Sequence, residues 1–313
     1  MEEINYGHKP VLLHECLDAL AIKPDGVYLD GTLGRAGHSL EIVRRLTAGG
    51  RLIALDRDET AIEAAQRRLA DYMDRVTLVH SNFSALDDVL RELGVRGVDG
   101  MLFDLGVSSP QLDDAARGFS YKQDAPLDMR MSQQGPTAAD LVNTLDREEL
   151  TRILRDYGEE PYAWQIAGKI VKAREKAPIL TTLQFADLIA SAMPPAERRK
   201  NKNPARRSFQ AVRIAVNGEL DALNEGMEAI FSRLAPGGRF CIITFHSLED
   251  RLVKQKFRRW AQRCTCPPEQ PICTCGGMPK AKLITRKPIE ADAGELEENR
   301  RSRSAKLRVL EKL

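Results

Sequence analysis

From Val27 to Ser39 the chain reads Val-Tyr-Leu-Asp-Gly-Thr-Leu-Gly-Arg-Ala-Gly-His-Ser, and Leu40, Val43 and Leu46 follow at helical spacing. An apolar run, three glycines at every third position and an apolar helical face predict a strand, a tight loop and a helix. Glycine permits positive φ and close approach of a ligand to the backbone, and a helix N-terminus offers unpaired N–H groups. We therefore expect a nucleotide-like ligand at this turn; a glycine-rich turn without a ligand is the alternative.

The glycine spacing narrows the choice of ligand. It reads G-x-x-G-x-x-G, which is neither the dinucleotide pattern G-x-G-x-x-G nor a Walker loop, since no Gly-Lys-Ser/Thr follows. Asp30 ends the first strand, and Asp56 ends a second predicted strand that starts at Arg51. A carboxylate in that place accepts two ribose hydroxyls, so a sugar-bearing cofactor is favoured.

Composition predicts a globular protein. The chain has 313 residues, 42% of them hydrophobic, and a net charge of +2. At roughly 150 residues per domain, this length suggests about two domains. No apolar run reaches the roughly 18 residues of a transmembrane helix, and residues 1–5 lack the features of a signal peptide. We expect a cytoplasmic protein with no membrane partner.

The chain next alternates between strand and helix patterns. Predicted strands at 51–56, 76–80 and 98–105 are separated by predicted helices at 59–72 and 84–93, the latter with Ser84 as its N-cap. Strands separated by helices of about ten residues or more form βαβ units and a parallel sheet.

The alternation stops after the strand that ends near Leu105 and resumes about a hundred residues later. Helical patterns fill the interval, and then a helix at about 212–234, a strand at 240–245, a helix at 248–263 and a strand at 307–310 follow, with 282–285 as a further candidate strand. The expected division is a sheet domain formed by residues 1–108 and 214–313, and an inserted all-helical domain formed by residues 109–213.

Four loops are expected at the carboxyl edge of the sheet, where ligands of α/β proteins bind. They span residues 31–38, 56–58, 81–83 and 104–111. Together they offer a turn for a charged tail, a carboxylate for a ribose, an aromatic ring for a base and a last carboxylate near the reacting centre. This set suits S-adenosylmethionine, whose sulfonium is attracted by carboxylates and aromatic faces and which needs no pyrophosphate clamp.

Eight motifs, spread over nearly the whole chain, carry a family resemblance. They are His8-Lys-Pro-Val-Leu-Leu-His-Glu15, Asp30-Gly-Thr-Leu-Gly-Arg-Ala-Gly-His38, Leu55-Asp-Arg-Asp58, Asp104-Leu-Gly-Val-Ser-Ser-Pro-Gln-Leu-Asp113, Arg117-Gly-Phe-Ser120, Pro126-Leu-Asp-Met-Arg130, Phe209-Gln-Ala-Val-Arg-Ile214 and Phe245-His-Ser-Leu-Glu-Asp-Arg251. With these motifs the chain resembles the MraW family of 16S ribosomal RNA cytosine N4-methyltransferases. The resemblance implies an α/β fold, a Rossmann-like class I methyltransferase sheet with an inserted all-helical substrate-recognition domain.

The resemblance also implies roles for individual residues. Those implied to bind the cofactor are Ala36, Gly37 and His38 at its amino-acid part, Asp56 at its ribose, Phe83 near its adenine, and Asp104 and Gln111, which complete the pocket. Ala36 departs from the glycine that relatives often have, and its methyl group fits if the residue is not at positive φ. Asp104 is also a hypothetical acceptor for the N–H groups of the cytosine amine.

Two histidines have alternative interpretations. His246 follows the predicted strand that ends at Phe245, so it either reaches the target base or shuttles a proton, or it caps the next helix. For His38, motif position favours contact with the cofactor over a capping role.

Two basic segments suggest an RNA partner. Residues 198–207 hold six basic residues in ten, and a second set lies at 251–263. A charge run alone is more often a solvated surface, but beside an RNA methyltransferase core we interpret these segments as contacts to a phosphate backbone.

The cysteines form one cluster and two isolated positions. Cys264, Cys266, Cys273 and Cys275 have a spacing that four thiolates of a structural zinc site would allow, although C-x-C pairs chelate less well than C-x-x-C knuckles. An oxidisable loop without metal is the alternative. Cys16 and Cys241 stand in apolar surroundings and are expected to be small core residues.

The function that the resemblance implies is S-adenosylmethionine-dependent N4-methylation of a cytidine in 16S rRNA, in the decoding region of the small ribosomal subunit. The partner is then 16S rRNA, expected within the subunit, and a homodimer is left open. The alternatives are a dinucleotide-dependent oxidoreductase and a non-catalytic zinc-stabilised RNA-binding protein. The glycine spacing disfavours the first, and the intact cofactor loops disfavour the second.

Overall fold

A computed structural model describes residues 9–132, 134–200, 203–264, 266–267, 269–272, 274 and 276–313, except for the side chain of Ser109. The chain divides into two compact units. The sheet unit consists of Met1–Gly106 and Ala222–Leu313, and the helical unit consists of Val107–Asp221.

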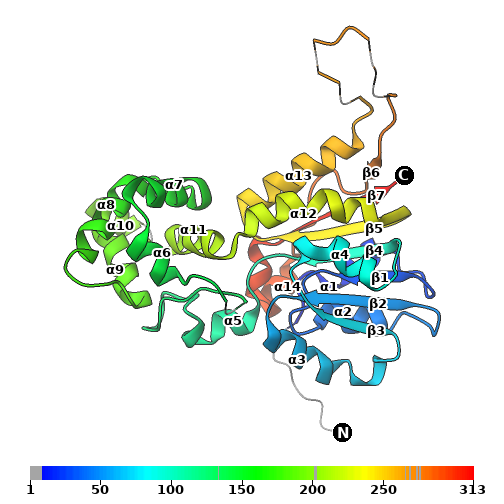
Figure 1. The fold of residues 1–313 in the computed structure, drawn as a ribbon, viewed down its shortest axis with the longest axis horizontal. Helices are drawn as coiled ribbons and strands as arrows, with labels where there is room; N and C mark the ends of the chain where they lie inside the picture. Colours follow the sequence, from blue (N-terminus) through cyan, green and yellow to red (C-terminus); the bar gives the residue numbers. More distant parts are fainter. Residues whose placement is uncertain are drawn as a thin grey trace. The chain divides into compact units, whose positions relative to one another are not determined.

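The sheet unit is built on seven strands in the order β3-β2-β1-β4-β5-β7-β6 (Figure 1). Strands β1 to β5 are parallel, and β7 is antiparallel to both of its neighbours. This sheet confirms the expected fold class. The strands are β1 (Val27–Asp30), β2 (Arg51–Asp56), β3 (Val76–His80), β4 (Val98–Asp104), β5 (Leu234–Thr244), β6 (Ala281–Leu283) and β7 (Lys306–Lys312).

Helices cover both faces of the sheet, and the alternating buried side chains of the strands divide between two cores. Helices α1 (Leu13–Leu20), α2 (Gly37–Val43) and α3 (Glu59–Arg68) contribute to one core. Helices α4 (Leu86–Glu92), α12 (Glu219–Arg233) and α13 (Ser247–Ala261) contribute to the other. The remaining helix of this unit is α14 (Ala293–Glu298). Apolar residues on both faces of the strands explain the nearly continuous hydrophobic runs in their sequences.

The helical unit has a core of its own, with Ile166, Phe185 and Phe209 fully or almost fully buried. Capping boxes begin four of its described helices, with Ser108, Thr137, Asp146 and Thr181 as the N-caps. Its helices are α5 (Ser109–Asp113), α6 (Ala138–Thr144), α7 (Arg147–Gly158), α8 (Ala163–Arg174), α9 (Thr182–Ala192), α10 (Pro195–Lys200) and α11 (Arg206–Asn217).

Two sequence-based expectations about the ends of helices are wrong. The helix expected at 212–234 is two helices, because Gly218 adopts φ +57° between α11 and α12. Ser84 is not the N-cap expected; Asn82 caps a short 3₁₀ turn, accepting the Ser84 N–H at 3.3 Å, and α4 begins at Leu86. Local polar residues compete for such caps, and the sequence pattern does not rank them.

Among the described residues, no helix is long and apolar enough to span a membrane.

Candidate active site at the carboxyl edge of the sheet

Asp30, at the end of β1, is buried beneath the glycine loop. Its carboxylate accepts hydrogen bonds from Ser39 Oγ at 2.6 Å and from the Thr32 N–H at 3.1 Å. Burial raises the pKa of Asp30 to about 6, against the opposing effect of these two hydrogen bonds. Asp30 therefore holds the two ends of the loop together.

Asp56, at the end of β2, receives two backbone N–H groups. Its Oδ2 accepts from Gly34 at 2.8 Å and its Oδ1 from Asp58 at 2.9 Å. Burial raises the pKa of Asp56 above its usual value, although both hydrogen bonds act in the opposite direction. Each carboxylate oxygen has lone-pair capacity beyond its one N–H, so the group can also accept ribose hydroxyls.

Asp104 ends β4 and has the most strongly perturbed carboxyl group of the three. Its backbone N–H donates to Thr32 Oγ1 at 2.5 Å, which ties β4 to the glycine loop. Its Oδ1 is buried without a hydrogen-bond partner among the described residues, while the side chain as a whole is 26% exposed. Burial, followed by the charges of Asp30 and Glu249, raises the pKa of Asp104 to about 8. At neutral pH this carboxyl group is mostly protonated.

His38 is buried beside Asp104 and is neutral. Its Nε2 donates to the Val11 carbonyl at 2.9 Å, so the proton is on Nε2 and Nδ1 has a lone pair. Burial lowers the pKa of His38 to about 4. Nδ1 lies 3.9 Å from Asp104 Oδ2. The ring therefore presents an acceptor to the protonated carboxyl group.

The loop between β1 and α2 needs glycine at one position for packing. A Cβ on Gly31 would lie 2.2 Å from the ring of Phe103, whereas a Cβ on Gly34 would meet no atom closer than 4.0 Å. The condition under which the Ala36 methyl group was expected to fit is not met, because Ala36 adopts φ 56°, yet the residue is fully buried. The left-handed conformation ends the turn before α2, and the packing of the Ala36 methyl group in the core offsets its strain.

Phe83 and Gln111 have observable structural partners. The Phe83 ring contacts Phe103 edge-on, with centroids 5.6 Å apart. Gln111 belongs to the helical unit, where it is buried and its Oε1 accepts the Ser108 N–H at 3.0 Å in the capping box of α5. Contact of either residue with a cofactor stays a prediction.

His246 is the N-cap of α13. Its Nδ1 accepts the Glu249 N–H at 3.4 Å, and Glu249 Oε2 accepts the N–H groups of Phe245 at 2.9 Å and His246 at 3.3 Å. The structure thus shows the capping alternative, and a catalytic role of His246 stays a prediction.

Two of the sequence-predicted sites lie partly outside the described residues. Cys264 and Cys266 are described, while Cys273 and Cys275 are not, so the zinc site stays a prediction that metal analysis of the purified protein will check. The basic segment 198–207 includes residues 201 and 202, which also lie outside the described residues, and its contact with RNA stays a prediction. Cys16 and Cys241 are fully buried in the core, as expected.

Three residues that shape this edge were given no site role from the sequence. Thr32 holds the backbone of Asp104, Asp30 closes the loop, and Glu249, which is 2% exposed, adds negative charge near Asp104. Thr32 and Asp30 lie inside the quoted motif, so their position was a usable signal. Glu249 lies inside the quoted motif at 245–251, but the motif does not reveal its proximity to Asp104, which depends on tertiary structure.

The carboxyl edge fits a cationic nucleoside cofactor. Asp104 Oδ1 is an acceptor without a partner among the described residues, Asp56 is oriented by the glycine loop, and three carboxyl groups lie where positive charge would stabilise their ionised forms. A pyrophosphate would meet the same carboxyl groups unfavourably.

Comparisons with known proteins agree over the full chain. Ribosomal RNA small subunit methyltransferase H of Paenibacillus sp. (strain JDR-2) is 57% identical over 98% of this chain and 100% of that protein. The protein of the same name from Brevibacillus brevis is 54% identical over 100% of both chains. A solved structure of a putative methyltransferase from Streptococcus mutans in complex with SAH has a TM-score of 0.44 and 11% identity over 98% of this chain and 100% of that one.

The description of the matching family model is "MraW methylase family", and the match covers residues 5–313. With this match and relatives above 50% identity over their whole length, the chain belongs to the MraW methylase family.

Proposed function

We propose that this protein transfers a methyl group from S-adenosylmethionine to the exocyclic N4 amine of a cytidine in 16S rRNA, in the decoding region of the small ribosomal subunit. Family membership supports RNA methylation, and the names of the relatives support a ribosomal RNA substrate. The observation that carries the chemistry is Asp104, a buried carboxyl group at the end of β4 with an oxygen that has no partner among the described residues.

S-adenosylmethionine supplies an electrophilic methyl group on a sulfonium when it is bound. We assign Asp56 to its ribose hydroxyls, the loop at Ala36, Gly37 and His38 to its amino-acid part, and Phe83 to its adenine. The backbone N–H groups of Gly34 and Asp58 hold the Asp56 carboxylate in one orientation, so little of its freedom remains to be lost on binding.

Asp104 orients the amine in this proposal. The lone pair of a cytosine amine is delocalised into the ring, which makes the amine a poor nucleophile. A carboxylate that accepts its N–H groups favours pyramidalisation as the amine attacks the methyl carbon in line, and the departing proton has an acceptor close by. The positive charge of the cofactor lowers the pKa of Asp104 and so favours the carboxylate form that this role needs.

The decisive experiment measures rRNA nucleosides by mass spectrometry. Small subunits from a strain without this protein should lack N4-methylcytidine at one site, and the purified protein with S-adenosylmethionine should restore it. Asp104→Ala should abolish restoration, while Asp113→Ala, at an exposed acidic position of the helical unit, should retain it. Normal methylation by Asp104→Ala would remove this residue from the mechanism, and unchanged nucleosides in the deleted strain would refute the proposed substrate.

A further inference from the structure

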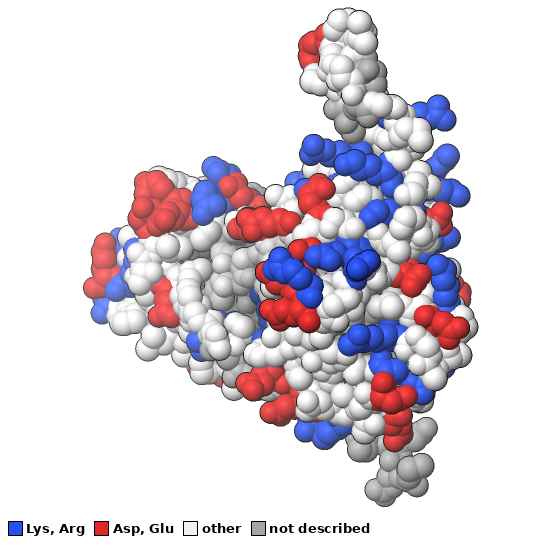
Figure 2. All heavy atoms as spheres, turned by 45° about the vertical axis from the view of Figure 1, so that its right-hand side comes forward, with Lys and Arg blue, Asp and Glu red and all other residues white. Residues whose placement is uncertain are grey.

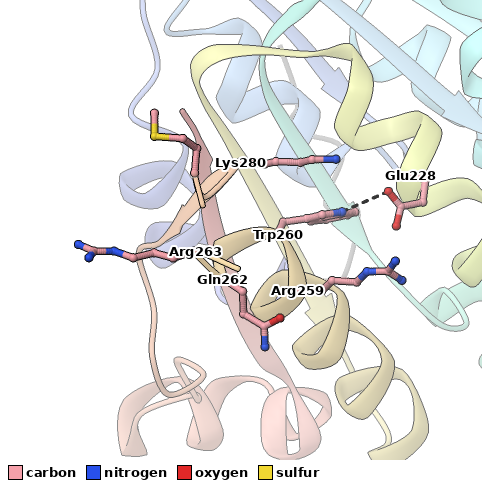
Figure 3. Close-up of a pocket in the computed structure, with 7 residues that line it drawn as sticks. Glu228, Arg259, Trp260, Gln262, Arg263 and Lys280 are labelled. Carbon is pink, nitrogen blue, oxygen red and sulfur yellow. Dashed lines mark hydrogen bonds between the residues drawn. The ribbon is translucent and has the colours of Figure 1, made fainter. Parts of the chain in front are cut away.

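A cleft with a volume of about 210 Å³ lies at the carboxyl-terminal end of α13, whereas the candidate active site lies toward the amino-terminal end of this helix. Its lining residues are Glu228, Arg259, Trp260, Gln262, Arg263, Met278 and Lys280. Figure 3 shows the indole of Trp260 in the centre, with Arg259 and Lys280 on its two sides and the Arg263 side chain extending outward. The cleft therefore combines three cationic side chains with one carboxylate.

The pairings in the sheet place this cleft at the amino-terminal edge of the parallel strands. Two backbone hydrogen bonds fix Lys280. Its carbonyl accepts the Leu313 N–H at 3.0 Å, and its N–H donates to the Trp260 carbonyl at 2.8 Å. Glu311 of β7 pairs with Arg239 of β5, which in turn lies opposite Gly100, near the start of β4. Helix α13 starts at the carboxyl edge, and its 15 residues span about 22 Å before they reach the cleft.

Trp260 is held in the cleft by ring stacking and a hydrogen bond. The Trp260 indole stacks on Phe231 with centroids 4.2 Å apart and an angle of 11° between the ring planes. Its Nε1 donates to Glu228 Oε2 at 3.2 Å, and Lys256 Nζ lies 3.2 Å from Glu228 Oε1. The single carboxylate of the cleft is thus already neutralised by Lys256. In the described part of the chain, Arg259, Arg263 and Lys280 have no carboxylate partner of this kind.

The exposed face of α13 continues this positive charge toward the carboxyl edge. Both acidic residues of the helix lie in its first turn: Glu249 is buried, and Asp250 pairs with Arg308 at 2.6 Å. The exposed residues that follow are all hydrogen-bond donors without negative charge, namely Arg251, Gln255, Arg258, Arg259, Gln262 and Arg263. On the face shown in Figure 2, several Lys and Arg side chains gather in the upper right of the view.

We infer that this cleft and the exposed face of α13 form a track for the phosphodiester backbone of RNA, with one phosphate held between Arg259 and Lys280. A line of cations about 22 Å long matches an extended polyanion better than a small anion. The inference rests on the proposed function, and it extends that function: the substrate would contact the sheet unit at both edges. Phosphate contacts position an RNA without reading its sequence, so this contact supplies affinity and leaves the choice of cytidine to the active site.

The test compares Arg259→Gln/Lys280→Gln with the matched control Arg67→Gln/Arg96→Gln, which removes two exposed arginines of the same unit. The probe is an unmodified 16S rRNA transcript, and its dissociation constant is measured by filter binding between 50 and 300 mM KCl. We expect the cleft variant to bind roughly tenfold more weakly near 150 mM KCl, with a slope of log K against log salt smaller by about 1.5. The control should stay within about twofold of the parent protein.

A second variant should change RNA affinity in the opposite direction. Glu228→Gln removes the carboxylate, keeps an acceptor for Trp260 Nε1 and releases Lys256, so RNA affinity should increase about threefold. Binding of S-adenosylhomocysteine, measured by calorimetry, should be unchanged in all these variants, because the cleft lies at the opposite edge of the sheet.

Equal RNA affinity and equal salt slope for the cleft variant and the parent protein would overturn the inference, as would an equal loss in the control. Cleft-dependent binding to phosphatidylserine vesicles without cleft-dependent binding to RNA would also overturn it. If the parent protein binds the transcript through the cleft but methylates no small subunit, the track is supported and the proposed function fails. If methylation proceeds and the cleft variant binds normally, only the track fails.

Discussion

Asp30, Asp56 and Asp104 end three neighbouring parallel strands, and burial raises the pKa of each carboxyl group. Burial makes the ionised form of these carboxyl groups unfavourable. A bound cationic ligand offsets part of that free-energy cost by attracting the carboxylates. His38 contributes in the opposite sense, since burial lowers its pKa to about 4. Because these pKa values are shifted in different directions, substituting one of these residues at a time separates its contribution to the pH dependence of stability.

The first prediction concerns stability between pH 6.5 and 8. The pKa of Asp104 is about 8 in the folded state against an ordinary value of 3.8, so the folded protein holds a proton that the unfolded chain has released. The free energy of unfolding should then fall as pH rises, by about 1–2 kcal/mol across this window. Asp30 loses most of its difference above its pKa of about 6, and His38 destabilises only as pH falls below 6.5, so Asp104 dominates in this window.

Urea unfolding of the ligand-free protein at three pH values measures this dependence. Asp104→Asn should abolish most of the slope, while Asp113→Asn, at an exposed position, should keep it. The same slope in Asp104→Asn as in the parent protein would contradict the assignment.

The second prediction ranks two glycines of the same loop. Gly31→Ala places a Cβ 2.2 Å from the fully buried Phe103 ring and should destabilise the fold by about 3 kcal/mol or more. Gly34→Ala meets no close atom and is strained only by φ +51°, at roughly 1 kcal/mol. Denaturant midpoints give the order, and an equal loss in both variants would show that Phe103 yields to the new methyl group.

At the scale of single elements, residues at helix termini determine where each helix begins and ends. Helix α13 begins with a capping box in which His246 and Glu249 each accept backbone N–H groups. The break between α11 and α12 at Gly218 likewise depends on one left-handed residue. Each feature depends on one or two residues at the start or end of a helix.

The third prediction separates capping from catalysis at His246. His246→Ala should cost about 1 kcal/mol of stability, because the N-cap acceptor is lost, and His246→Asn should retain most of it. We expect the Asn variant to keep near-parental methylation of small subunits, measured with radiolabelled S-adenosylmethionine. Parental stability with lost turnover in His246→Asn would instead assign the imidazole a catalytic role.

At the scale of the whole molecule, one sheet assembled from both ends of the chain supplies a ligand edge and, at its other edge, the basic cleft. The preference for a cationic nucleoside cofactor over a dinucleotide depends on the whole sheet, because three different strands bring the relevant carboxyl groups together. The helical unit has its own core, so its part in binding RNA is a separate question from the integrity of the sheet.

The fourth prediction uses the thermal midpoint to discriminate cofactors. S-adenosylhomocysteine at about 100 times its dissociation constant should stabilise the protein by roughly 3 kcal/mol and raise the midpoint by several degrees. The same concentration of NAD should leave the midpoint unchanged, since no pyrophosphate-sized glycine turn is present in the sequence. Stabilisation by NAD alone would favour the oxidoreductase alternative.

The sequence by itself determined the parallel strands of the sheet and the helices between them, since hydrophobic runs, glycines and turn residues act over short distances. The antiparallel pairing of β7 came only with the tertiary structure. It also located Asp56 and Asp104 at the ends of strands, because a strand end follows directly from where an apolar run stops. Tertiary structure alone decided that Glu249 lies close enough to raise the pKa of Asp104, that Ala36 is left-handed, and that α13 carries its positive charge away from the carboxyl edge. These features depend on contacts between residues far apart in the chain, and a local pattern contains no information about which distant side chain will fill a given space.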